Sequence, residues 1–137
     1  MKLLIDTNIV IDVLQKREPW FSYSYRILER CISGIDEGFL SAHSLSDIFF
    51  IVRKSHSEEA RKAAIVFLCT YFSIIPEDKN AYLSIAQNSI FEDLEDGLQI
   101  YDASHEKLDY IITRNVKDFL QSPIQAIEPK DFLSVGH

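Results

Sequence analysis

The sequence contains few of the residues on which several classes of protein depend. It has two cysteines and four histidines in 137 residues, and no His/Cys cluster with ligand spacing, which argues against zinc. We expect Cys31 and Cys69 to be reduced thiols in the core. No apolar run approaches the length of a membrane span, and Asp6 interrupts the first one. We therefore expect no signal peptide and no membrane segment, and a cytoplasmic protein.

Positive charge is also scarce. The 14 Lys and Arg residues face 21 Asp and Glu residues, for a net charge of −7, so composition does not suggest a general electrostatic grip on nucleic acid. That argument weakens if the acids cluster and bind a cation. The most concentrated basic group is typical of a solvated face more often than of an RNA track; it consists of Arg53, Lys54, Arg61 and Lys62.

The hydrophobic pattern predicts alternating strands and helices within one domain, residues 1–137. Short apolar runs at 3–5, 38–42, 73–75, 109–113 and 125–127 predict buried strands, and segments with helical periodicity lie between them. Repeated alternation of this kind is typical of a parallel sheet with helices on both faces. We predict an α/β fold, a three-layer α/β/α sandwich with a central parallel sheet of four to five strands.

The first predicted strand ends in an acid. Asp6 is followed by Thr7 and Asn8, both good helix-capping residues, and then by apolar residues at helical spacing. In open α/β sheets, ligands bind outside the carboxyl ends of the strands. A lone carboxylate that only caps a helix would be costly directly after a buried strand, so we favour a functional role for Asp6.

Other polar residues stand near the ends of predicted elements, and no Lys or Arg lies between residues 80 and 106 to neutralise the acids there. Like charges at close range raise one another's pKa or attract a cation. Hard divalent ions such as Mg²⁺ and Mn²⁺ take oxygen ligands. The residues concerned are Asp47, Asp93, Asp96, Asn115 and Asp118.

Three motifs, in this order along the chain, resemble the PIN domain family. They are Leu4-Ile5-Asp6-Thr7-Asn8, Glu95-Asp96-Gly97-Leu98-Gln99 and Ile112-Thr113-Arg114-Asn115-Val116-Lys117-Asp118-Phe119. More narrowly, they are similar to the VapC-type ribonuclease toxins of toxin-antitoxin modules. This resemblance implies a carboxylate cluster that binds Mg²⁺ or Mn²⁺, cleavage of single-stranded RNA, a cognate antitoxin as partner, and a homodimer.

The resemblance also implies roles for individual residues. Asp6 and Asp96 match the family's first and third acids and would hold the main ion. Asp47 matches the second acid, where the family usually has Glu, and Asn115 stands where the family often has Asp. Asp118, one turn further on, could supply the missing charge as a metal ligand. Supporting residues that would position these acids or share their helix face are Thr7, Asn8, Asp93 and Thr113.

The departures at Asp47 and Asn115 keep a second function open, a PIN-like binding module without nuclease activity. A phosphoaspartate domain is disfavoured because the first strand has no Asp-x-Asp pair and the lysine expected directly after the late strand is missing, Arg114 standing there instead. We expect Asp12 and Glu95 to be surface charges. Aromatic residues of the second and third helices could form a dimer surface or belong to the core. None of the scattered histidines is expected to act as a catalytic base: His43, His56, His105 and His137.

Overall fold

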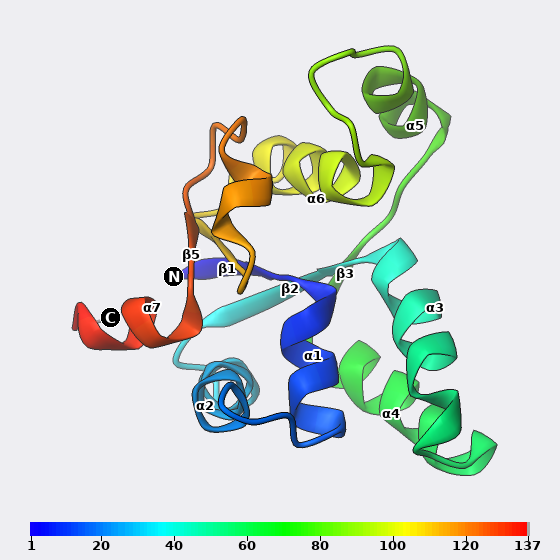
Figure 1. The fold of residues 1–137 in the computed structure, drawn as a ribbon, viewed down its shortest axis with the longest axis vertical. Helices are drawn as coiled ribbons and strands as arrows, with labels where there is room; N and C mark the ends of the chain where they lie inside the picture. The colour runs from blue at the N-terminus through cyan, green and yellow to red at the C-terminus, as the bar shows by residue number, and fades with distance from the viewer. Residues whose placement is uncertain (137) are drawn as a thin grey trace.

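A computed structural model describes residues 1–136; His137, one of the four histidines named above, lies outside the described residues. A five-stranded sheet runs through the centre, with the order β3-β2-β1-β4-β5 and parallel pairing at every step (Figure 1). This confirms the predicted parallel sheet and gives it five strands. The strands are β1 (Lys2–Ile5), β2 (Glu37–Ser41), β3 (Ser73–Ile75), β4 (Tyr110–Ile112) and β5 (Ala126–Ile127).

Helices lie on both sides of the sheet, as predicted (Figure 1). Below the sheet in this view are α1 (Thr7–Leu14), α2 (Phe21–Ile32), α3 (Ala42–Ile51) and α4 (Glu58–Tyr71). Above it are α5 (Lys79–Ala86) and α6 (Leu94–His105). Three short elements complete the fold: the 3₁₀ turns η1 (Val52–Lys54) and η2 (Val116–Phe119), and the C-terminal helix α7 (Pro129–Ser134).

Local sequence signals explain where several helices begin. The Ser57 hydroxyl accepts a hydrogen bond from the backbone N of Ala60 at 3.1 Å, and Asp78 caps α5 in the same way at 3.0 Å. Asp93 caps α6, its Oδ1 accepting from the backbone N of Asp96 at 2.9 Å. Each cap satisfies a backbone donor that the first turn of a helix leaves free.

The core has one main part on each face of the sheet. Leu3 and Ile5 of β1 belong to the part between the sheet and α1, α2 and α4. Leu4 belongs to the part between the sheet and α6, together with Ile100 and Ala103. All three β1 side chains are fully buried, which is the burial expected of a strand covered on both faces. The strand that leads to Asp6 is therefore covered on both faces along its last three residues.

Two predictions about single residues are wrong. Cys31 is buried, but Cys69 is exposed because Leu68 is the buried residue of α4 and its neighbour faces outward. Asp12 is fully buried and not on the surface. Its carboxylate accepts two hydrogen bonds from the guanidinium of Arg114, at 2.8 and 3.1 Å, and this ion pair makes its burial possible.

Other surface features bear on possible contacts. Trp20, Tyr23, Tyr25 and Phe50 are exposed, whereas Phe21 and Phe49 are partly buried, so the aromatic residues of this region divide between surface and core. Across residues 1–136, no helix combines the length and apolar character that a membrane crossing requires.

Candidate functional site

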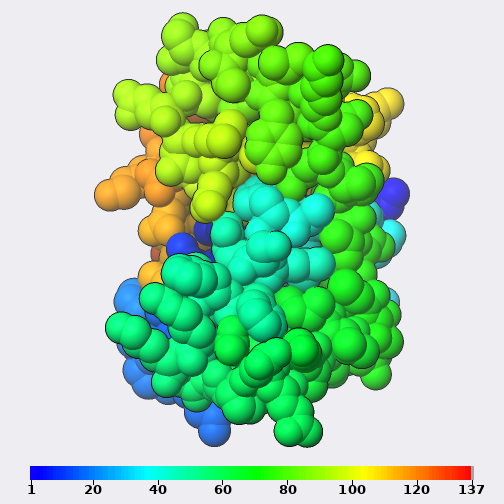
Figure 2. Space-filling model, turned by 90° about the vertical axis from the view of Figure 1, so that its right-hand side faces the viewer, coloured from blue at the N-terminus to red at the C-terminus, as the bar shows by residue number. Residues whose placement is uncertain are grey.

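The carboxyl ends of β1, β2 and β4 meet at one edge of the sheet, where α1 and α3 begin. Figure 2 looks onto this edge, and blue atoms of the N-terminal segment are visible in a hollow. The yellow-green start of α6, the orange segment that follows β4, and the cyan-green start of α3 surround that hollow. The position is the one in which open α/β sheets bind ligands.

Asp6 lies at the centre of this edge and is only 6% exposed. Thr113 Oγ1 donates to its Oδ2 at 2.8 Å, and Gln99 Nε2 donates to its Oδ1 at 3.3 Å. Burial raises the pKa of Asp6, and the bonds from Thr113 and Gln99 partly oppose that shift. Asp6 is the N-cap residue of α1 but makes no side-chain capping hydrogen bond there, and the backbone N–H groups of Thr7 and Asn8 also oppose the rise in its pKa.

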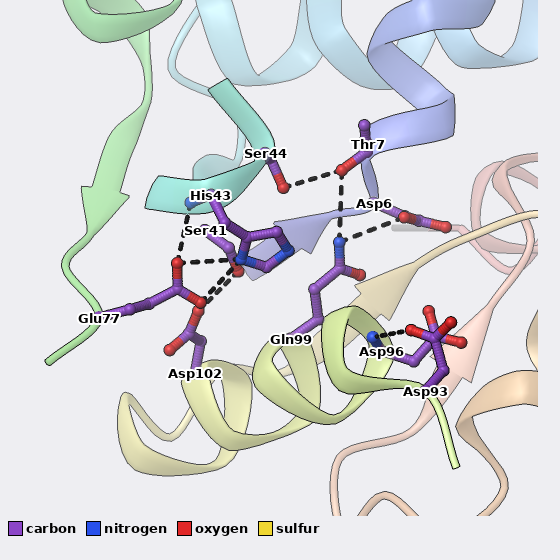
Figure 3. Close-up of polar contacts among 10 residues, drawn as sticks. All are labelled: Asp6, Thr7, Ser41, His43, Ser44, Glu77, Asp93, Asp96, Gln99 and Asp102. Atoms are coloured by element: carbon purple, nitrogen blue, oxygen red, sulfur yellow. Dashed lines mark hydrogen bonds and ion pairs between the residues drawn. The ribbon is translucent and has the colours of Figure 1, made fainter. Parts of the chain in front are cut away.

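The residues predicted to support Asp6 have different positions. Thr113 Oγ1 also accepts a hydrogen bond from the backbone N of Asn115 at 2.9 Å, which links Asp6 to the segment after β4. Thr7 Oγ1 donates to Ser44 Oγ at 2.8 Å and accepts from Gln99 Nε2 at 3.5 Å (Figure 3). Asn8 is partly buried in the first turn of α1. Thr7 and Thr113 therefore contact the groups around Asp6 directly.

Asp96 lies in the first turn of α6, partly buried and among other acids. Burial and the negative charges of Asp93, Asp6, Asp118 and Glu95 raise the pKa of Asp96 to about 7. The pKa shift means that these carboxylates lie close enough to repel one another. The fold thus brings Asp6, Asp96 and Asp118 together from three separate parts of the chain.

The residues at the rim of the site differ in exposure. Asp93 and Asp118 are exposed, and together with Asp96 they line a cavity of about 270 Å³. Lys117 lines the same cavity and is its one basic residue. Asn115 is partly buried at the start of η2. The acids that face this cavity outnumber the single lysine.

A second pair of acids lies nearby, on α3 and α6. The pKa of Glu95 is raised by burial and then by its contact with the carboxyl of Asp47. Asp47 Oδ2 is buried, and within residues 1–136 no donor reaches it. Glu95 is exposed, as predicted, but it faces another carboxylate, so it belongs with the site. Two facing carboxyls without a donor require a proton or a cation between them.

The side-chain atoms of these acids that could bind a metal are all oxygens, which suits a hard divalent ion such as Mg²⁺ or Mn²⁺ better than zinc. The buried, unpartnered Oδ2 of Asp47 is an observation that fits such an ion, and Gln99 Oε1 is a second buried oxygen with no partner in the described chain. Asp6 and Asp96 would be the main ligands of such an ion, and Asp47 and Asp118 the other candidate ligands. The residues present therefore fit a divalent cation.

Sequence reasoning missed Gln99 as a site residue. It lies three residues after Asp96, on the same face of α6, and is 3% exposed. That spacing was the available signal, because residues three apart on a helix share a face. A second missed group, His43 with Glu77 and Asp102, lies on the other side of Gln99 in Figure 3.

The profile of the PIN domain family matches residues 2–117 of this sequence. The chain belongs to the PIN domain family. A toxin-antitoxin complex from Klebsiella pneumoniae contains a similar chain, 26% identical, with a TM-score of 0.69 over 93% of this chain and 97% of that chain. No protein with a curated description matches the chain.

Two further solved structures share the fold of this PIN domain. VapBC2 from Rickettsia felis, bound to a DNA fragment from its promoter, is 20% identical with a TM-score of 0.68, over 93% of this chain and 98% of that chain. VapC20 from Mycobacterium tuberculosis, a toxin that cleaves the sarcin-ricin loop, is 11% identical with a TM-score of 0.65, over 80% and 86%. These likenesses confirm the fold predicted from the sequence.

The crowding of acids around Asp96 predicts that its charge lowers the stability of this PIN domain. The pKa of Asp96, about 7, lies above the ordinary 3.8, so the folded protein holds that proton more tightly than the unfolded chain. Stability is therefore lost as the pH rises from about 4 to 7. We expect Asp96→Asn to raise the free energy of unfolding at pH 8 by about 1 to 2 kcal/mol, allowing for solvent screening, and by less at pH 4.5.

Urea unfolding at the two pH values measures this difference. The matched control is Asp131→Asn, which changes an exposed acid of α7 in the same way. A loss of stability at pH 8 for Asp96→Asn, relative to Asp131→Asn, would show that the charge of Asp96 does not destabilise the folded protein.

Proposed function

We propose that this PIN domain is a metal-dependent endoribonuclease that hydrolyses RNA phosphodiester bonds as the toxin of a toxin-antitoxin module. The observation that carries the proposal is the gathering of Asp6, Asp96 and Asp118 at the carboxyl edge of the sheet, with the pKa of Asp96 raised to about 7. A site of this charge repels an RNA phosphate unless a cation is bound between them. Family membership supports RNA as the substrate class.

The residues of the site have separate roles in this proposal. Asp6 and Asp96 would be the main ligands of a divalent ion, with Asp47 and Asn115 or Asp118 as further ligands. Such an ion, when bound, would supply an activated water and neutralise charge on the phosphate. Thr113 and Gln99 fix the orientation of the Asp6 carboxylate through the hydrogen bonds described above. Thr7 holds Gln99 in turn, and it is tied to α3 through Ser44.

The solved structures support an antitoxin as the partner, because the Klebsiella pneumoniae chain comes from a toxin-antitoxin complex. An apolar groove of about 620 Å³ between α1, α2 and α4, lined by residues such as Val10, Leu28 and Phe67, offers a surface for such a partner. The homodimer is a further part of this proposal. The exposed aromatic side chains Tyr25 and Phe50 are available for contacts of either kind.

The test is cleavage of a mixed single-stranded RNA by the purified protein in Mn²⁺, in Mg²⁺ and in EDTA. We expect cleavage with either ion and none in EDTA, with activity restored when Mn²⁺ is returned. If a folded protein cleaves nothing in any metal, the shorter acid at Asp47 and the amide at Asn115 have disabled the site. The chain would then be a PIN-like binding module, and the nuclease proposal would be wrong.

A further inference from the structure

Three residues from three elements converge beside the acid cluster, on the far side of Gln99 (Figure 3). His43 is in the first turn of α3, Glu77 lies between β3 and α5, and Asp102 is in α6. One ligand atom from each lies within 4.8 Å of the other two. The group combines an imidazole with two carboxylates, and residues far apart in the sequence form it only when the chain folds.

The contacts within this group are short, and the group is enclosed. His43 Nδ1 lies 2.9 and 2.8 Å from the two oxygens of Glu77, and the backbone N of His43 donates to Glu77 Oε1 at 2.8 Å. Ser41 Oγ donates to Asp102 Oδ2 at 2.6 Å. The side chains of His43 and Glu77 are 12% and 3% exposed, and Asp102 is 1% exposed.

Negative charge exceeds positive charge in this enclosed group. Two carboxyls face one imidazole, so a protonated His43 still leaves one negative charge uncompensated. Among the described residues, no Lys or Arg forms an ion pair with Glu77 or Asp102. Burial, together with the charge of Glu77, raises the pKa of Asp102 to about 7. An excess charge in such a place is held with a proton or with a cation.

Nδ1 is the imidazole nitrogen of His43 that faces the carboxylates, and it lies within hydrogen-bonding distance of both oxygens of Glu77, so a bound cation would take the place of the proton there. Nε2 is buried without a partner in residues 1–136, on the side of the ring that faces Gln99 (Figure 3). An imidazole nitrogen favours transition ions such as Zn²⁺ over Mg²⁺, which prefers oxygen. Ser41 already orients Asp102 by a hydrogen bond, as residues around metal ligands commonly do.

We propose that His43, Glu77 and Asp102 bind one divalent transition-metal ion at a site separate from the carboxylates of Asp6 and Asp96. The ion joins the segment before α5 to α3 and α6, the two helices that carry Asp47 and Asp96. It therefore stabilises the packing of these elements beside the carboxyl edge of the sheet. This inference does not depend on the nuclease proposal.

The test uses Zn²⁺ alone as the probe and the full chain with the double substitution Asp6→Asn and Asp96→Asn, which removes the main ligands of the other site. Calorimetric titration is expected to show about one equivalent of bound Zn²⁺. Adding His43→Asn or Asp102→Asn to this protein is expected to weaken binding at least about tenfold. The matched control, His105→Asn, changes an exposed histidine of α6 and is expected to leave binding unchanged.

A second measurement covers variants that fold poorly. The thermal unfolding midpoint of the double-substituted chain is expected to rise with Zn²⁺ and to return with EDTA, because an ion that binds only the folded state stabilises it. No bound Zn²⁺ and no midpoint shift would overturn the proposal. Binding that survives both His43→Asn and Asp102→Asn would overturn it as well. Neither measurement uses RNA, so their failure leaves the nuclease proposal intact.

Discussion

Replacing Asp6 with asparagine is expected to lower the rate of RNA cleavage on the order of 1000-fold while the protein remains folded. Asparagine has almost the same shape as aspartate and keeps an oxygen that can accept from Thr113, which now donates at 2.8 Å. It removes the charge that would bind the ion. Asp6 is nearly buried, and burial disfavours its charged form, so the neutral side chain fits the fold.

Single-turnover cleavage of a single-stranded RNA in saturating Mn²⁺ measures this effect, and circular dichroism checks the fold. Asp131→Asn is again the control, because Asp131 is exposed in α7. Undiminished cleavage by Asp6→Asn would contradict the proposed role of the site. Cleavage lost equally in both variants would point to a general loss of activity.

The Arg114→Ala variant is expected to be about 3 kcal/mol less stable than the wild type, because it leaves a buried carboxylate without its partner. Asp12 is fully buried, and its two oxygens accept from Arg114 at 2.8 and 3.1 Å. The guanidinium also lies 3.9 Å from the centre of the Trp20 ring, a contact that alanine would lose as well. Urea unfolding at pH 7 measures the change.

The control for this prediction is Arg53→Ala. Arg53 also stacks on an aromatic ring, that of Phe50 at 3.8 Å, but it is exposed and pairs with no buried acid. We expect its removal to cost less than about 1 kcal/mol. Equal losses for Arg114→Ala and Arg53→Ala would mean that the ion pair with Asp12 contributes nothing beyond stacking. Arg114 follows Thr113, so the pair also anchors the segment that positions Asp6.

The sequence predicts the sheet, and the place of Asp6 at its edge, for one physical reason. A strand buried on both faces is a continuous apolar run, and the residue that ends it must lie at the edge of the sheet. Leu3, Leu4 and Ile5 show this pattern, so the position of Asp6 follows from it. Asp96 belongs to a group of acids with no nearby Lys or Arg, a pattern visible along the chain, and its assignment to the site came from the resemblance of its motif to the PIN family.

Contacts between distant elements could not be predicted in the same way. The partner of Asp12 is 102 residues away along the chain. A sequence that does not reveal this partner gives no reason to expect a buried aspartate. Gln99 and the group of His43, Glu77 and Asp102 likewise depend on how α3 and α6 pack against the sheet. Periodicity indicates which face of a helix is buried, but it does not identify the polar groups that meet there.

The most direct test of the central claim, that carboxylates at the sheet edge hold an ion against the RNA phosphate, replaces one phosphate oxygen with sulfur. A single-stranded RNA with this change at its cleaved bond is compared with the normal RNA in Mg²⁺ and in Mn²⁺. Mg²⁺ binds sulfur poorly and Mn²⁺ accepts it more readily. We predict that one phosphorothioate stereoisomer is cleaved at least about tenfold more slowly in Mg²⁺ and that Mn²⁺ restores most of the rate. Cleavage slowed equally in both ions, or cleavage that continues in EDTA, would contradict the account.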